Sequence, residues 1–153
     1  KALSFLARRA HAEKELFLKL KAKSYNEGLI KTVIKELRNL SFLDDREFAT
    51  QFVNEKSLRK KWGKQKIKSA LINKGINYKI IDEVLSKNNL DKLEAEQIKD
   101  LALKKYSLVK KREKDQKKMM QKLISFLISK GYSYELATEA VRQITKSDFI
   151  DYD

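Results

Sequence analysis

Cysteine and proline are absent from the 153-residue chain, which has only four glycines and one histidine. The absence of cysteine excludes disulfide bonds, thiolate metal ligands and cysteine nucleophiles. A single histidine excludes a metal cluster that is built on several imidazoles. A chain rich in β-sheet needs turn residues every ~8–12 positions. With so few glycines and no proline, the composition therefore predicts helices.

Long apolar runs are also absent, because no uninterrupted run exceeds three residues. A helix that spans a bilayer needs about 20 predominantly apolar residues, so we expect no contact with a membrane. The chain also lacks the apolar core of a signal peptide. Its length corresponds to about one ordinary domain. With no predicted membrane span and no signal peptide core, we expect a cytoplasmic protein.

Positive charge is abundant and unevenly distributed. The chain has 35 lysines and arginines against 21 aspartates and glutamates, which gives a formal net charge of +14. Seven basic and no acidic residues occur from Lys56 to Lys68, and nine basic and two acidic residues occur from Lys104 to Lys122. This patchiness favours a basic face that binds a polyanion or an acidic surface. The alternative is a lysine-rich helix face that is only solvated.

One helix–turn–helix unit occurs three times, at offsets of 51 and 56 residues. Its first helix ends at a residue suited to the left-handed conformation, which glycine adopts without strain. Two residues later, a side chain suited to an N-cap begins the next helix. The turn and cap positions are Ser24 with Asn26, Gly75 with Asn77, and Gly131 with Ser133.

Another helix precedes each of these units. The best marked begins at Asp44, with Glu47 at the third helical position, which resembles a capping box, and with Leu43 and Phe48 placed as a hydrophobic staple. The sequence therefore predicts an all-α chain of three tandem three-helix repeats, which form an elongated, curved body. The predicted boundaries are 1–43, 44–90 and 91–153, and the last repeat ends in a short C-terminal tail.

Three stretches carry a family signature. The first reads Phe42-Leu43-Asp44-Asp45-x-x-Phe48-Ala49-x-x-Phe52-Val53. The second reads Trp62-Gly63-x-x-x-Ile67-x-x-x-Leu71-x-x-Lys74-Gly75-Ile76. The third reads Arg9-x-His11-x-x-x-Glu15-Leu16-x-x-x-Leu20, with Ala12 where the family usually has serine. Together they resemble the RecX family, the regulators of the RecA recombinase, over nearly the whole chain and most specifically across residues 40–76.

The resemblance implies an all-helical protein that binds RecA filaments on single-stranded DNA and lies in the helical groove. It implies a modulator of RecA, mainly a negative regulator, which acts in DNA repair, homologous recombination and the SOS response and restrains ATP hydrolysis, strand exchange or filament extension. RecX proteins also bind DNA themselves, so single- and double-stranded DNA are expected partners and the charge of +14 fits. We expect a monomer with no cofactor, no metal and no catalytic residue.

Two basic segments are the candidate contacts with filament or DNA. In the central segment, charges spaced three and four residues apart are expected to share helix faces. The second run lies between two helical patterns, as a mobile loop or as a continuation of the preceding helix. The candidate residues are Lys56, Arg59, Lys60, Lys61, Trp62, Lys64 and Lys68, and then Lys110, Lys111, Arg112, Lys114, Lys117 and Lys118.

Some residues suggest chemistry but have a structural explanation. Asp44 and Asp45 could bind a metal or act in catalysis, although a helix cap is the expected role. Trp62 could stack on a base or anchor a partner, or pack against Leu58. We expect His11 to be a structural or capping residue rather than a proton shuttle. Phe42, Phe48 and Phe52 could stack on bases, but their helical spacing favours core packing. Tyr25, Tyr132 and Tyr134 lie in turns and are expected to pack over the helix ends.

Three functions therefore compete. The first is a non-catalytic RecA modulator, and the second is a free-standing basic helical DNA-binding protein that competes for DNA. The third is an enzyme, such as a phosphodiesterase with paired carboxylates. The enzyme is the poorest of the three, because the chain has no cysteine, a single histidine and no glycine-rich phosphate loop.

Overall fold

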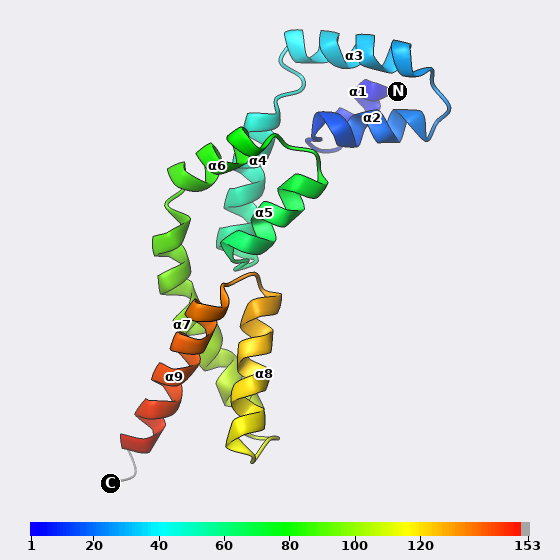
Figure 1. The fold of residues 1–153 in the computed structure, drawn as a ribbon. Coiled ribbons are helices and arrows are strands. Elements are labelled where there is room, and N and C mark those ends of the chain that lie inside the picture. Colours follow the sequence, from blue (N-terminus) through cyan, green and yellow to red (C-terminus); the bar gives the residue numbers. More distant parts are fainter. Residues whose placement is uncertain (151–153) are drawn as a thin grey trace. The chain divides into compact units, whose positions relative to one another are not determined.

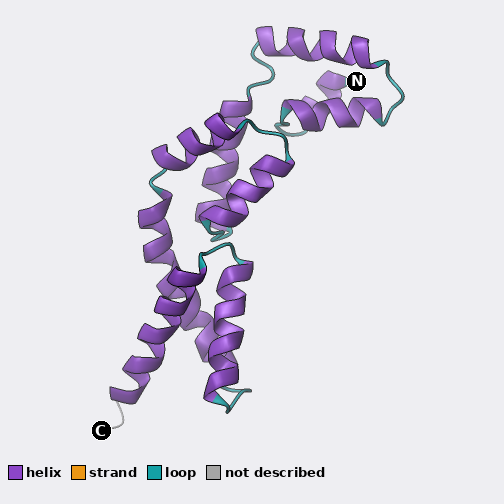
Figure 2. Ribbon diagram, in the orientation of Figure 1, coloured by secondary structure: helices purple, strands orange, loops and turns teal. Residues whose placement is uncertain are grey.

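The computed structural model describes residues 1–150, with the side chains of 1–146. Across that part of the chain it contains nine α-helices, one π-helical turn and no strand (Figures 1 and 2). The all-α prediction is confirmed. Within the described residues, no helix is both long enough and apolar enough to cross a membrane.

The helices follow one another in groups of three, joined by short turns. The first group is α1 (Ala2–Leu6), α2 (Glu13–Lys21) and α3 (Glu27–Asn39). The second is α4 (Asp45–Asn54), the π-helical turn η1 (Glu55–Arg59), α5 (Lys64–Asn73) and α6 (Tyr78–Lys87). The third is α7 (Leu90–Val109), α8 (Gln116–Ser129) and α9 (Tyr134–Ile150). The prediction of three three-helix repeats is therefore confirmed, and its boundaries at 43 and 90 and its elongated, curved shape stay predictions.

The turns inside the repeats form as their local sequence predicts. Ser24, Gly75 and Gly131 have φ angles of 63°, 80° and 98°, so all three adopt the left-handed conformation. The next helix then begins at a capping side chain: Asn26 accepts hydrogen bonds from Gly28 N and Leu29 N, and Asn77 accepts one from Lys79 N. The turns expected near Gly75 and Gly131 are confirmed.

The start of α4 is also as predicted. The Asp44 side chain accepts hydrogen bonds from Arg46 N and Glu47 N, and Leu43 and Phe48 are both buried. Glu47 departs from the capping-box expectation, because its carboxylate accepts a hydrogen bond from Gln51 one turn further along. Asp44 is therefore a cap, as expected.

The chain folds into two compact units. Unit 1 consists of Lys1–Glu55 and Lys68–Asn88, and unit 2 of Lys56–Ile67 and Asn89–Asp153. In unit 1, Leu16, Leu20 and Ile30 lie in the buried core that α2 and α3 share. In unit 2, the core comes from α7, α8 and α9, with Ala102, Leu123, Leu127, Tyr132 and Val141 at its centre.

A carboxylate from the following repeat completes the N-terminus of a helix at two places. Asp45 accepts a hydrogen bond from Glu13 N, the first residue of α2, at 2.9 Å within unit 1. Glu94 accepts one from Lys64 N, the first residue of α5, within unit 2. The first turn of a helix leaves backbone N–H groups without intrahelical partners, and these two side chains satisfy one in each repeat.

Glu94 makes a testable contribution to the pH dependence of stability. Burial raises the pKa of Glu94 above 4.5 and the charge of Asp91 adds to this, although the hydrogen bond from Lys64 N opposes it. The folded chain therefore binds this proton more tightly than the unfolded chain, and the resulting stability is lost as pH rises through the pKa of Glu94.

Glu94→Gln keeps an acceptor oxygen for Lys64 N and removes the charge. We expect the variant to be at least as stable as the wild type at neutral pH and to lose this advantage below pH 4.5. Urea unfolding of both proteins at the two pH values measures it, and a variant that is less stable at neutral pH would contradict it.

Some packing predictions were wrong. Tyr132 is buried as expected, but Tyr25, Tyr134 and Phe42 are exposed. Tyr25 and Phe42 lie in the connections after α2 and α3, and Tyr134 is the first residue of α9. Leu58 is also exposed, with 53% of its surface accessible. The predicted C-terminal tail is part of α9 up to Ile150, and residues 151–153 lie outside the described residues.

Candidate nucleic-acid interface

The central basic segment has an irregular backbone between two regular helices. After α4 the chain continues as the π-helical turn η1, and Lys61 then adopts the left-handed conformation with φ 54°. The Trp62 N–H closes this bend by donating to Lys56 O at 2.9 Å. Such π-turns and positive φ angles in bulky residues are costly and often occur at functional sites. Because η1 is wider than an α-helix, the i, i+3, i+4 face predicted for Lys56, Arg59 and Lys60 does not form as an α-helical face.

Within unit 2, the bend is fixed to the turn between α8 and α9. Gly63 N donates to Lys130 O at 2.8 Å, and Gln65 N donates to Gly131 O at 3.2 Å. The Tyr132 hydroxyl donates to Lys61 O at 3.0 Å. Burial raises the pKa of Tyr132 to about 12, and the charge of Glu94 adds to it. The hydroxyl is therefore a permanent donor at neutral pH, and it holds the strained residue in place.

Trp62 lies between lysine ammonium groups rather than in the core. Lys66 Nζ lies 4.6 Å and Lys56 Nζ 5.3 Å from the ring centroid. Lys66 Nζ also donates to Ser129 O at 2.9 Å, which ties the cation to the α8–α9 turn. The ring is half-buried. Cation–π contacts of this kind are worth about 0.5–1 kcal/mol at exposed sites, and they fix the two lysines around the ring.

The structure adds three lysines that the sequence did not single out. Lys66 was passed over, although it lies in the basic run four residues after Trp62. Lys130 Nζ and Lys105 Nζ lie 5.8 and 4.9 Å from the Phe126 ring centroid in the same unit. Lys105 lies in the basic run from Lys104 to Lys122 but was not named as a candidate contact, and Lys130 comes near Gly63 only through the folded turn. The aromatic and cationic groups of unit 2 thus extend from the bend to α8 and α7.

Two of the predicted lysines have acidic partners. Lys64 pairs with Asp91 at 3.0 Å within unit 2, and Lys68 pairs with Asp82 at 3.0 Å within unit 1. The sequence has no acidic residue beside them, but the folded chain supplies Asp91 from α7 to Lys64 and Asp82 from α6 to Lys68. The exposed cations of the bend are therefore Arg59 and Lys60, with Lys61 half-buried beside them.

Residues 110–115 of the second basic run form a loop rather than a continuation of α7, and Lys117 and Lys118 lie in the first turn of α8. α7 ends at Val109 and α8 begins at Gln116. Glu113 pairs with Lys122 at 2.7 Å, and Asp115 caps α8 by accepting from Lys118 N. Lys110 Nζ lies 5.3 Å from the Tyr106 ring centroid. The other predicted residues are exposed to solvent: Lys111, Arg112, Lys114, Lys117 and Lys118.

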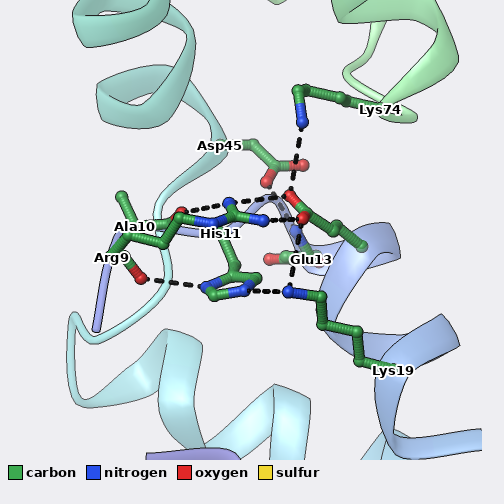
Figure 3. Close-up of polar contacts among 8 residues, drawn as sticks. Arg9, Ala10, His11, Glu13, Lys19, Asp45 and Lys74 are labelled. Atoms are coloured by element: carbon green, nitrogen blue, oxygen red, sulfur yellow. Dashed lines mark hydrogen bonds and ion pairs between the residues drawn. The ribbon is translucent and has the colours of Figure 1, made fainter. Parts of the chain in front are cut away.

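A polar cluster in unit 1 gathers around the start of α2 (Figure 3). Glu15 pairs with Arg9, with Lys74 at 3.5 Å and with Lys19 at 3.6 Å. Burial acts to raise the pKa of Glu15, but the hydrogen bond from Arg9 and the charges of Lys74 and Arg9 outweigh it and lower the pKa to about 2. The cluster is thus held by a permanent carboxylate, which is a structural arrangement.

His11 lies in the same cluster with both ring nitrogens engaged. Nδ1 lies 2.9 Å from Arg9 O, and Nε2 lies 2.8 Å from Lys19 Nζ (Figure 3). Burial lowers the pKa of His11, and the charges of Arg9 and Lys19 add to this against the backbone hydrogen bond. The ring is therefore neutral at neutral pH, with Nδ1 donating and Nε2 accepting. Among the described residues, no group of three His, Asp or Glu side chains is placed to hold a metal ion.

Comparisons with known proteins match this chain over most of its length. The three RecX family models fit in order, as the first three-helix domain at residues 1–37, the second at 44–85 and the third at 93–141. "Regulatory protein RecX" of Clostridium acetobutylicum is 43% identical over 147 residues, which are 94% of this chain and 67% of that protein. The protein of the same name from Chlorobium phaeobacteroides is 34% identical over 95% of this chain and 92% of its own length.

The structural comparison agrees with the sequence comparison. The crystal structure of RecX from Lactobacillus salivarius has a TM-score of 0.79 and 26% identity, and the match covers 94% of this chain and 92% of that one. A second crystal structure, of a regulatory protein RecX, also gives a TM-score of 0.79, at 27% identity. The resemblance found in the sequence is therefore confirmed, and the chain belongs to the RecX family of regulatory proteins.

Proposed function

We propose that this chain modulates RecA, mainly as a negative regulator, by binding in the groove of RecA filaments on single-stranded DNA. Bound there, it restrains ATP hydrolysis, strand exchange or filament extension. Membership of the RecX family supports a regulatory role. In the proposed mode of action the chain acts by binding alone, as a monomer in the cytoplasm, without catalysis or a cofactor.

The bend of unit 2 is the observation that carries the proposed contact. Its backbone is fixed by three hydrogen bonds to the α8–α9 turn, so the cations around Trp62 are held before a partner arrives. A surface that is already ordered loses less conformational entropy on binding. Lysine and arginine side chains attract phosphates, and an aromatic ring among them can stack on an unpaired base. A RecA filament on single-stranded DNA offers phosphates next to protein. The cations around Trp62 could bind those phosphates while the ring contacts a base or the protein.

The amount of protein needed for inhibition tests the proposal. The DNA-dependent ATPase of RecA is measured while the chain is added at amounts too small to coat the DNA. Loss of ATPase under these conditions supports direct engagement of the filament. Loss only at amounts that coat the DNA would instead support the competing function, in which the chain is a DNA-binding protein that displaces RecA.

Arg59→Glu with Lys60→Glu tests the bend itself. Both side chains are exposed, so we expect the fold to survive while binding to single-stranded DNA and to RecA filaments weakens. The salt slope of binding should fall by about 0.7 for each phosphate contact that is lost on single-stranded DNA. Lys64 and Lys68 are left unchanged, because their replacement would break ion pairs with Asp91 and Asp82 and could change the stability of the fold as well as binding.

Lys99→Glu with Lys146→Glu is the matched control. These exposed residues of α7 and α9 lie outside the bend, and the double change alters the net charge equally. The control should bind more tightly than the test variant. Equal losses in the two variants would show that net charge alone controls binding and would remove the bend as the contact surface.

A further inference from the structure

A cleft in unit 1 is lined by apolar and acidic residues, although the chain as a whole is strongly basic. It encloses about 580 Å³ between α1, the loop after α1, the α3–α4 loop and the first turns of α4. Its walls include Leu3, Phe42 and Phe48, and the carboxylates of Asp44 and Glu47 also line it. None of the residues that line the cleft is lysine or arginine, whereas 35 of the 153 residues in the chain are. The cleft is thus apolar on its walls and negative where Asp44 and Glu47 line it.

The apolar walls of the cleft are open to solvent. Leu3 and Phe42 are both 57% exposed, although Leu43 beside Phe42 is buried. Ser41 has a φ of 59°, and this left-handed residue stands at the turn after which Phe42 points outward and Leu43 inward. A non-glycine residue in this conformation costs of order 1 kcal/mol. Two large apolar side chains are therefore left uncovered in a chain with a mean hydropathy of −0.59.

The cleft adjoins a second apolar groove. This groove, of about 420 Å³, lies between α1 and α3 and is also lined by Leu3 and Phe42, together with Leu20, Leu29 and Leu40. Because the two hollows share Leu3 and Phe42 as lining residues, they are neighbours on unit 1. Exposed apolar surface of this kind, with charged groups beside it, is typical of a protein–protein contact.

Charge complementarity decides which partner fits. A long basic side chain has an aliphatic stem that packs on apolar walls and a cationic head that binds carboxylates. Arginine fits best, because its planar head can bind a carboxylate with two hydrogen bonds and stack on an aromatic ring such as Phe42. We infer that this surface docks a protein segment in which an arginine enters the cleft and a neighbouring apolar side chain enters the groove.

The probe for this inference is the blocked dipeptide acetyl-leucyl-arginine amide. Its counterpart with citrulline has nearly the same shape and no charge. We expect both to be detected by amide chemical shifts of the whole chain, with the largest changes for the arginine peptide at Ala10 and Phe48 and in the loop around Ser41. The citrulline peptide should bind at least about tenfold more weakly, because it cannot form charge-assisted hydrogen bonds. Equal binding of the two peptides would overturn the inference.

Asp44→Asn with Glu47→Gln tests the carboxylates without removing the helix cap, because asparagine is an equally good N-cap. We expect it to abolish the preference for arginine over citrulline. Glu47→Gln alone leaves Asp44 untouched and should reduce that preference in part. Glu135→Gln with Glu139→Gln, two exposed positions of α9 in unit 2, is the matched control and should keep the preference. A preference that survives in the first variant, or that falls equally in the control, would overturn the inference.

This inference goes beyond the proposed function, and its test uses no RecA and no DNA. If the chain binds the arginine peptide but does not inhibit RecA, the inference about the cleft stands and the proposed function is wrong. If it inhibits RecA but does not prefer the arginine peptide, the proposed function stands and the inference about the cleft is wrong.

Discussion

Replacing Gly63 with alanine is expected to destabilise the chain by about 3 kcal/mol, because there is no space for a side chain at this position. A Cβ atom on Gly63 would collide with the carbonyl carbon and oxygen of Gly131 and would lie 2.6 Å from Tyr132 N. These are backbone atoms of a turn that is itself hydrogen-bonded to Gly63 and Gln65. Relief of the collision must therefore pull the bend away from the α8–α9 turn. Inhibition of RecA should fall with stability if the bend carries the contact.

Urea unfolding measures the loss, and Gly28→Ala is the control. Gly28 lies in the first turn of α3, where alanine is favoured over glycine by up to about 1 kcal/mol and the added Cβ would meet only the end of the Asn26 side chain. The control should therefore change stability by no more than that amount. A Gly63→Ala variant as stable as the control would show that the contact between the bend and the α8–α9 turn is loose.

Replacing Glu15 with glutamine is expected to give the second large loss, of up to about 3 kcal/mol at neutral pH, which follows from a pKa lowered from 4.5 to about 2. Because the pKa is lowered on folding, the unfolded chain binds this proton more tightly than the folded chain, and stability increases with pH. The charged carboxylate stabilises the folded chain at every pH above 4.5, and this stability is lost as pH falls toward 2. The difference between wild type and variant should therefore be largest at neutral pH and disappear near pH 2.

Glu27→Gln is the control for Glu15→Gln. Glu27 also pairs with a lysine, Lys21, at 2.6 Å, but both side chains are more than half exposed. Pairs of this kind contribute little, because water screens them. We expect the unfolding midpoint of the control to stay close to that of the wild type at each pH. A Glu15→Gln variant that behaves like the control would show that the cluster around Arg9 and Lys74 is not coupled to folding.

Local features of the fold were predictable from the sequence because they depend on a few adjacent residues. The turn at Gly75 needs one residue with a positive φ, and the start of α4 needs an acceptor side chain at Asp44. Both requirements are satisfied within four positions of the chain, so the residue types alone indicate them. The repeat added further support, since the same residue pattern around Gly131 indicated the same turn as the pattern around Gly75.

The candidate interface was less predictable because its geometry depends on contacts between distant residues. The basic run from Lys56 to Lys68 could be found, but Lys64 and Lys68 are neutralised by Asp91 and Asp82 from other helices. Likewise, Lys66 reaches Ser129 O across 63 positions. Such pairings arise only when the helices are packed, and no local pattern marks them. The exposure of Phe42 was missed for the same reason, because helical spacing does not say which side of a turn faces solvent.

The two carboxylates that cap α2 and α5 have a consequence for a chain that is made from its N-terminus onward. Asp45 is synthesised 32 residues after Glu13, and Glu94 30 residues after Lys64. The second helix of each of these repeats therefore lacks an acceptor for its first N–H group until the next repeat has left the ribosome. In α8 the capping side chain is local instead, since Asp115 in the loop just before the helix accepts a hydrogen bond from Lys118 N. We therefore expect α2 and α5 to gain these capping hydrogen bonds only after the following repeat has been synthesised, whereas the cap of α8 is available as soon as α8 itself is made.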